Sequence, residues 1–437
     1  MSCRFQEAGK GVVGERVRSC VMRLGSNAGA ASFFCVSLVF ATSALAQDLG
    51  RNWSIKGFGT FGVSGTDTDQ LEYRRDISQA SGVTRSAGID IDSRLGLQLD
   101  VDITDTLHTT VQWVARQHPG DFFEQNLDWA FLRWRPAADL DLRVGRLGFD
   151  VFMLSDYRNV GYAYPWVRPP HEFYGGLPVY HFDGADIAHR FQVGDGQLTL
   201  KGFGGYAYYQ VPGPFSTLFD ASSALGGASA VYELGNWRAR IGYVYTLNLS
   251  DPPFGPLSSA LDNPTVNAFW PGASGLKDDF KVKNAAVQFS SIGLAYDDGE
   301  WLGQIEGAYI DSEVNLYPTV ANGYFSIGRR LGSFTPYVLL GIAETLNEVV
   351  DVPPLLLPVP QLQAFRSAVD QALNGNGVDE KSVSLGVRWD VYENIAVKAQ
   401  WSHYWLGQNG TQLWVEPASG PTPDQVNVWS VGVDFMF

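Results

Sequence analysis

One stretch of the chain, residues 148–180, concentrates side chains that could act on a polar solute: GFDVFMLSDYRNVGYAYPWVRPPHEFYGGLPVY. Aromatic rings offer stacking surfaces to sugars and aromatic acids. Carboxylates that face guanidinium groups across a narrow, low-dielectric gap create a field that orders dipolar solutes. The candidate residues in this stretch are Asp150, Asp156, Arg158, Tyr162, Tyr164, Trp166, Arg168 and Glu172.

This stretch does not alternate as the sequence on either side of it does, and its four prolines forbid a central strand. Long connections in compact domains are uncommon and are usually functional. So many aromatic side chains would be poorly placed in water. We therefore expect residues 148–179 to fold inward and to narrow a pore; an outward-facing surface loop is the alternative.

Bases on the neighbouring strands are the natural counterparts of the acids in this stretch. Alternation places five of them on the inward face of a wall, on the first three expected strands and on two near the C-terminus that become neighbours when the sheet closes. We expect these bases to oppose the loop acids across the opening. The alternative is that each base pairs with an acid inside the wall. The five are Lys56, Arg94, Arg116, Arg388 and Lys398.

Catalytic chemistry has little support. Nucleophilic catalysis needs a base within reach of its nucleophile, and no nucleophile elbow or metal motif surrounds any histidine. Ser402 and His403 are adjacent in an expected strand, so their side chains face opposite sides. We expect no catalytic residue, metal or cofactor. The six histidines are His108, His118, His171, His181, His189 and His403.

The elements that would position these residues are strands with a period of two. Leu95, Leu97 and Leu99 share one face, while Arg94 and Gln98 share the other. Very short turns alternate with long links, as a transmembrane β-barrel requires, and a bilayer tolerates a sheet only when it is closed. The prediction is an all-β antiparallel barrel of about 16 strands, at 53–66, 88–103, 106–117, 126–136, 139–147, 180–193, 196–209, 224–235, 236–249, 281–298, 301–313, 320–332, 334–347, 380–392, 395–407 and 426–437.

The N-terminus predicts export. Basic residues precede the apolar run SFFCVSLVFATS, and Ala44 and Ala46 suit a signal peptidase, so residues 1–46 are expected to be a signal peptide and 47–437 the barrel. Translation could start at Met1 or Met22. The leader holds all three cysteines, five basic and two acidic residues, which leaves 26 Lys and Arg against 44 Asp and Glu. Such a balance argues against nucleic acid as a partner.

Five segments carry a resemblance to a known family. The last strand, NVWSVGVDFMF, ends on Phe437 and resembles the terminal assembly signal of bacterial outer-membrane barrels. The segments IKGFGTFGVSG (55–65) and LDLRVGRLGFDVFMLSD (140–156) resemble the general Gram-negative porins, whose third external loop bends into the barrel. SDYRNVGYA (155–163) and WVRPP (166–170) resemble an uncharacterised porin subgroup. The usual acidic PEFG-like element is not obvious, and the loop is unusually aromatic.

The resemblance implies a homotrimer in the outer membrane of a Gram-negative bacterium, in contact with lipid and lipopolysaccharide and inserted by the barrel-assembly machinery. It implies passive diffusion of small hydrophilic solutes and ions. The negative total charge suggests a mild preference for cations, although the charge of the pore decides this. The alternatives are a sugar- or carboxylate-specific channel with an aromatic binding track, and a structural or adhesive barrel. Residues 362–373 have helical periodicity and predict a short helix over the mouth, with a disordered cap as the alternative.

Overall fold

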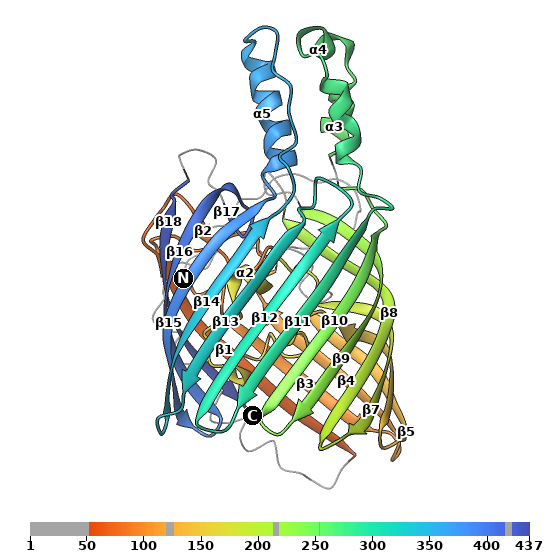
Figure 1. The fold of residues 1–437 in the computed structure, drawn as a ribbon, viewed down its shortest axis with the longest axis vertical. Coiled ribbons are helices and arrows are strands. Elements are labelled where there is room, and N and C mark those ends of the chain that lie inside the picture. Colours follow the sequence, from red (N-terminus) through yellow and green to blue (C-terminus); the bar gives the residue numbers. More distant parts are fainter. Residues whose placement is uncertain (1–51, 119–125, 213–217, 253, 416–421) are drawn as a thin grey trace, which may run out of the picture. The chain divides into compact units, whose positions relative to one another are not determined.

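A computed structural model describes residues 52–118, 126–212, 218–252, 254–415 and 422–437 (Figure 1). These residues belong to one compact unit, Asp48–Phe437. The expected signal peptide, residues 1–46, lies outside the described residues. Among the described helices, none is long and apolar enough to cross a membrane.

The unit is a closed barrel of sixteen strands in which every strand pairs antiparallel with its neighbours in the chain, and the last strand pairs with the first. This confirms the predicted fold class and all sixteen predicted strands. The barrel strands are β1 (Trp53–Thr66), β3 (Arg94–Asp102), β4 (Leu107–Arg116), β5 (Leu127–Ala137), β6 (Leu140–Gly148), β7 (His181–Val193), β8 (Gly196–Pro212), β9 (Leu218–Leu234), β10 (Trp237–Asn248), β11 (Ala286–Asp297), β12 (Trp301–Ser312), β13 (Val320–Arg329), β14 (Phe334–Thr345), β15 (Val378–Tyr392), β16 (Ile395–Thr411) and β18 (Gln425–Met436).

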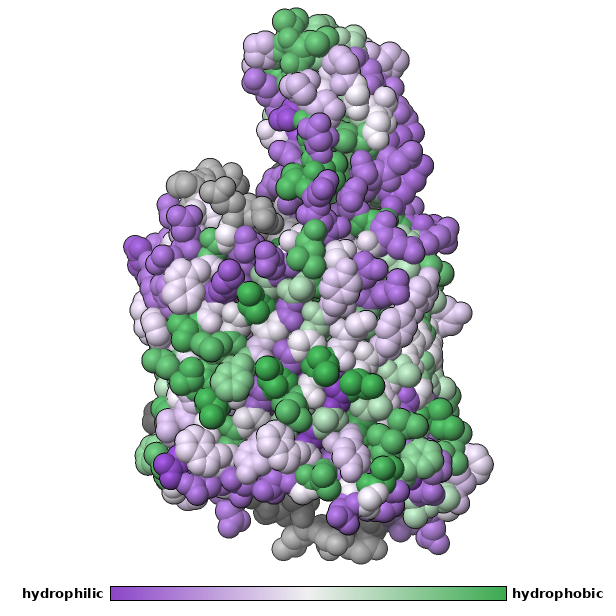
Figure 2. Space-filling view, viewed as in Figure 1, coloured by the Kyte–Doolittle hydropathy of each residue, from purple (hydrophilic) through white to green (hydrophobic). Residues whose placement is uncertain are grey.

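The alternation seen in the sequence becomes an apolar outer face. Leu97, Val144 and Ile292 are 42%, 57% and 64% exposed on the outside, whereas Arg94, on the inner face of β3, is only 6% exposed. Hydrophobic residues gather over the middle of the strands, and hydrophilic residues gather over the rim (Figure 2). An exposed apolar band around a barrel is the pattern of a wall that faces lipid.

The terminal residue takes part in the closure. The backbone N–H of Phe437 donates to the carbonyl of Gly57, and the N–H of Gly57 donates back, both at 2.9 Å. The Phe437 ring lies where a Cβ at position 57 would be, so glycine leaves room for it. Phe437 thus completes the seam, which is compatible with the assembly role predicted from the resemblance.

The connection between β10 and β11 and the connection between β14 and β15 form a helical extension beyond the strand ends (Figure 1). The extension has its own apolar core, in which Trp270 is fully buried. Its indole N–H donates to the carbonyl of Pro353 at 2.8 Å and its ring meets Phe365 edge-on, so the two connections fold together. The helix predicted at 362–373 is confirmed. The helices are α3 (Gly255–Leu261), α4 (Pro264–Phe269), η3 (Ala273–Phe280) and α5 (Pro360–Asn374).

The inward fold predicted for residues 148–179 is also confirmed. The chain leaves the wall at Gly148, rejoins it at His181, and forms η1 (Gly161–Ala163) and α2 (His171–Tyr174) within the barrel. A second segment, residues 67–93, departs from expectation: residues 67–87 were expected to be an external link, and residues 88–93 the start of the strand predicted at 88–103. It instead packs inside the mouth, where its strand β2 (Glu72–Tyr73) pairs with β17 (Trp414–Val415).

Candidate functional site

The candidate site is the lumen together with residues 149–180, called the inward loop from here on. Apolar packing is the first force that fixes this loop. Phe152 meets Phe173 with ring centroids 4.4 Å apart, and both pack toward Tyr324 of β13. Their burial removes a large apolar area from water, which favours the docked position.

Three polar contacts of the loop aromatics complete this packing. The indole N–H of Trp166 donates to the Ser326 hydroxyl at 2.7 Å, and the Tyr174 hydroxyl donates to Glu306 at 2.6 Å. Tyr164 and Trp166 are 3% and 1% exposed, so their rings serve the packing of the loop. Tyr162 stays half-buried, and its hydroxyl donates to the Glu393 carbonyl at 2.6 Å.

Lys398 and Arg388, two of the predicted wall bases, lie beneath the loop. The Lys398 ammonium donates to the carbonyls of Gly161, Tyr164 and Trp166 at 2.6–2.8 Å and pairs with Asp434 at 2.8 Å, fully shielded from solvent. Arg388 donates to the Tyr162 carbonyl at 2.7 Å and stacks over the Tyr162 ring. Both bases therefore bind the backbone of the loop, a partner that a sequence pattern cannot reveal.

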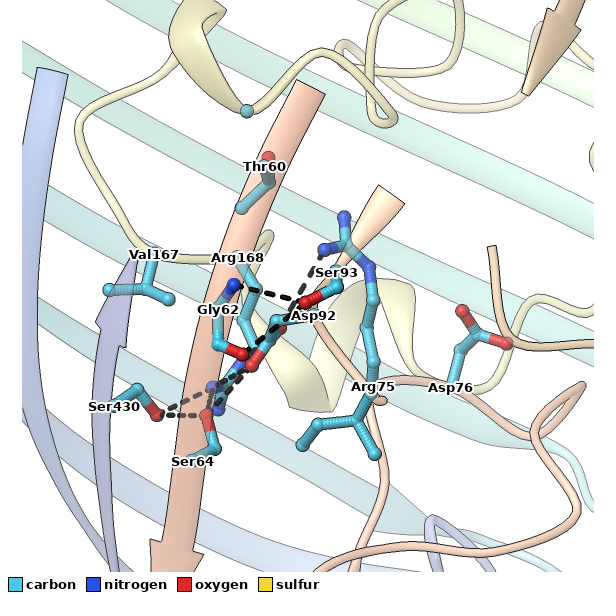
Figure 3. A network of polar contacts seen from close by, with 12 residues as sticks. Thr60, Gly62, Ser64, Arg75, Asp76, Asp92, Ser93, Val167, Arg168 and Ser430 are labelled. Atoms are coloured by element: carbon cyan, nitrogen blue, oxygen red, sulfur yellow. Dashed lines mark hydrogen bonds and ion pairs between the residues drawn. The ribbon is translucent and has the colours of Figure 1, made fainter. Parts of the chain in front are cut away.

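Arg168 joins the loop to the seam of the barrel and to residues 67–93. Its guanidinium donates to both carboxylate oxygens of Asp92, at 2.6 and 3.0 Å, and to the hydroxyls of Ser64 and Ser430 (Figure 3). Burial opposes the charge of Asp92, but the two-point contact with Arg168 outweighs it and lowers the pKa of Asp92.

Arg158 and Asp150 secure the two ends of the loop. Arg158 donates to the carbonyls of Leu177 and Val179 and lies 3.5 Å above the Tyr180 ring. Asp150 pairs with Lys201 at 3.0 Å and with Arg240 at 2.9 Å. Burial favours the neutral acid, yet these two cations hold the pKa of Asp150 below its usual range.

Glu172 and Asp156 lie in opposite environments. Glu172 is 3% exposed and lies beside His171 and Glu380. The His171 Nδ1 atom is 3.1 Å from the Oε1 atom of Glu380. Burial and then the charge of Glu380 raise the pKa of Glu172 to about 7. Asp156 is exposed and is the predicted loop acid that faces water.

The remaining wall candidates are split between water and the loops. Lys56 is 64% exposed and pairs with Asp100 at 3.0 Å. Arg116 pairs with Asp128 at 2.8 Å beneath the Tyr180 ring, and Arg94 lies buried near it. That these bases set the selectivity of a pore stays a prediction.

Sequence reasoning missed two partly exposed bases on the inner face of β5. Arg133 and Arg135 of β5 are about one third exposed, and together with Arg190 they share the carboxylate of Asp141 at 2.6–3.0 Å. The signal was present, because Arg133 and Arg135 alternate with the outward Leu132 and Trp134. Arg143 and Lys201, which the sequence places on nearby strands as bases that could hold the acids of the loop, share Asp186, and Lys201 also pairs with the loop acid Asp150.

Comparison with solved structures places this architecture among outer-membrane barrels. OmpF of Salmonella typhi in complex with daunomycin superposes with a TM-score of 0.51 at 12% identity, over 89% of this chain and 98% of that one. An anion-selective porin from Comamonas acidovorans gives a TM-score of 0.47 at 13% identity, over 88% and 100%.

No family model matches the sequence, and no curated protein matches it. The superposition on OmpF shows a porin-like fold, an architecture that the two proteins share at low sequence identity. Among the described residues, no group of three or more His, Cys, Asp and Glu side chains could hold a metal ion.

Proposed function

We propose that the protein is an outer-membrane channel that lets small hydrophilic solutes cross by passive diffusion and whose narrowest part is set by the inward loop. One observation carries this proposal. The loop is bonded to opposite parts of the wall, through Asp150 to Lys201 of β8 and through loop carbonyls to Lys398 of β16, while inward bases on β5 to β8 next to it stay partly exposed to water. A fixed obstruction beside a solvated polar surface is the arrangement of a size-limited aqueous path.

The charges of that surface favour anions over cations. Five bases share three carboxylates there, Asp141, Asp150 and Asp186, and Asp150 also pairs with Arg240, so the wall keeps a positive excess next to the exposed Asp156. A solute in this part of the lumen meets a basic wall on one side and a loop acid on the other. The transverse field predicted from the sequence would then act here. The five bases are Arg133, Arg135, Arg143, Arg190 and Lys201.

The proposal includes a cellular setting. Residues 1–46 would direct export, and the barrel would reside in the outer membrane of a Gram-negative bacterium after insertion by the barrel-assembly machinery. Its apolar outer face suits lipid, and its external helices would meet lipopolysaccharide. A homotrimer is the assembly that the sequence resemblance implies.

The test is single-channel conductance and reversal potential of the refolded protein in a planar bilayer. Deletion of residues 157–174 should enlarge the ohmic steps and weaken ion preference, because it removes the obstruction. Deletion of 263–271 is the matched control, since it shortens the helical extension and leaves the lumen intact. Equal conductance in all three proteins would contradict the role of the loop.

A structural or adhesive barrel is the second candidate. The density of bonds between loop and wall supports it, because almost all loop side chains between 164 and 175 are buried. The folded helical extension also offers a surface to which a partner protein could bind. Silence in the bilayer from protein with barrel circular dichroism would favour this candidate, whereas saturable current blocked by one solute would favour a specific channel.

A further inference from the structure

A small cavity lies between residues 67–93, strands β3 and β4, and the returning end of the inward loop. Its volume is about 10 Å³, and its lining includes Arg75, Arg94, Arg116 and Tyr180. That volume is close to the space of one water molecule. Three guanidinium groups thus converge on a space that one small particle can fill.

Arg94 points to what that particle is. The side chain is 94% buried, and its Nε and Nη2 atoms, both shut off from solvent, have no hydrogen-bond partner among the described residues. Its guanidinium forms no salt bridge with any carboxylate of the described chain within 4.0 Å. Arginine cannot lose its proton in a protein, so this charge cannot be removed by titration.

The carboxylates near the cavity already have other partners. Asp92 lies between Arg168 and Arg75 and is committed to Arg168, with its Oδ1 3.8 Å from Arg75 Nη1 (Figure 3). Asp128 pairs with Arg116.

Asp76 accepts from the Tyr180 hydroxyl at 2.5 Å and also from Ser78. The cavity is therefore lined by three guanidinium groups, Arg75, Arg94 and Arg116, and by only two carboxylates, Asp76 and Asp92. Asp92 is bound by Arg168 as well, so the lining keeps a positive excess.

We propose that this cavity is a binding site for a single small anion of the size of chloride. A water molecule could accept hydrogen bonds from Arg94 but would leave the excess charge uncompensated, which is strongly unfavourable in a buried site. A monoatomic anion supplies both the acceptor and the counter-charge. It joins Arg75 of the inward-packed segment to Arg94 of the wall, so the ion fastens residues 67–93 inside the mouth. This role is separate from solute passage.

The test is thermal unfolding of the refolded protein in chloride and in gluconate at constant potassium concentration and ionic strength. The expected result is a midpoint that rises with chloride, because a ligand that binds only the folded state multiplies the folded-to-unfolded ratio about tenfold for each tenfold increase above its Kd. Arg94→Met should abolish the dependence. Arg133→Met is the control: it removes an inward arginine that pairs with Asp141, away from the cavity, and it should keep the dependence.

Diffraction from bromide-soaked crystals of the unchanged protein keeps the proposal testable if Arg94→Met does not fold. An anomalous peak in the cavity, in contact with Arg75 and Arg94, is expected. An empty cavity in bromide, or a midpoint that is the same in chloride and gluconate, would overturn the proposal and assign the cavity to water.

Discussion

Replacement of Glu172 by Gln is expected to remove a pH dependence from the docking of the inward loop. The Glu172 carboxylate lies against β14 at Gly341, where a side chain would collide with it. Its Oε1 atom is buried without a hydrogen-bond partner among the described residues, and Ser382 bonds to the side chain. On the far side of the cluster, Glu380 accepts from the Trp414 indole at 2.8 Å.

The sign follows from proton uptake. Burial and Glu380 raise the pKa of Glu172 from 4.5 to about 7, so the docked state holds a proton in this interval that the released state does not. Docking is therefore strongest below pH 4.5 and weakens as the pH rises to about 7. At about 1.4 kcal/mol per pKa unit, the full change is on the order of 3 kcal/mol.

Hydrogen–deuterium exchange of peptides from residues 161–176 measures this local opening. Exchange in the unchanged protein should accelerate as the pH rises through the interval, after correction for the intrinsic pH dependence of exchange. Glu172→Gln should give a flat corrected profile. Asp156→Asn, which alters an exposed acid of the same loop, is the control and should keep the slope. Parallel profiles for the unchanged protein and Glu172→Gln would refute the reasoning.

Two further predictions concern buried anchors. Lys398→Met leaves Asp434 buried without its cation and leaves three loop carbonyls without the Lys398 donor, so loop docking should weaken by about 3–5 kcal/mol. Hydrogen–deuterium exchange at 161–166 should become faster and the single-channel current noisier; unchanged exchange would contradict the anchoring role. Trp270→Ala should destabilise the helical extension by about 3–5 kcal/mol, detected by limited proteolysis within 254–280, while conductance and barrel unfolding stay the same; a change in conductance would show that the extension acts on the lumen.

The strands were predictable because each carries its own evidence. The alternation of Leu95, Leu97 and Leu99 with Arg94 and Gln98 is local, and a one-residue slip would turn every side chain to the wrong face. The inward loop was predictable from its departure from that pattern. The packing of residues 67–93 inside the mouth was not, because it depends on distant partners such as Trp414 and Arg168.

The facing of the wall bases was predictable, but their partners were not. Alternation places Arg94, Arg388 and Lys398 inside the barrel, yet it says nothing of the depth at which a loop covers them. Alternation likewise places Arg133 and Arg135 inside the barrel, but it cannot show that they stay partly exposed. Their exposure depends on the inward loop, which does not cover them.

The division of the wall bases changes where a field across the lumen can arise. Lys398 and Arg388 donate hydrogen bonds to loop carbonyls. Arg168 forms a salt bridge with Asp92, and Arg240 forms one with Asp150. Charges neutralised within the protein contribute little to the potential in water, which is also screened within about 10 Å. In the proposed channel, the field on a solute would therefore come from groups that remain exposed, such as Asp156 on the loop and Arg133 and Arg135 on the wall. Asp156→Asn should shift the reversal potential further toward anions, whereas neutralising the buried Asp434 should alter loop docking and leave ion preference unchanged.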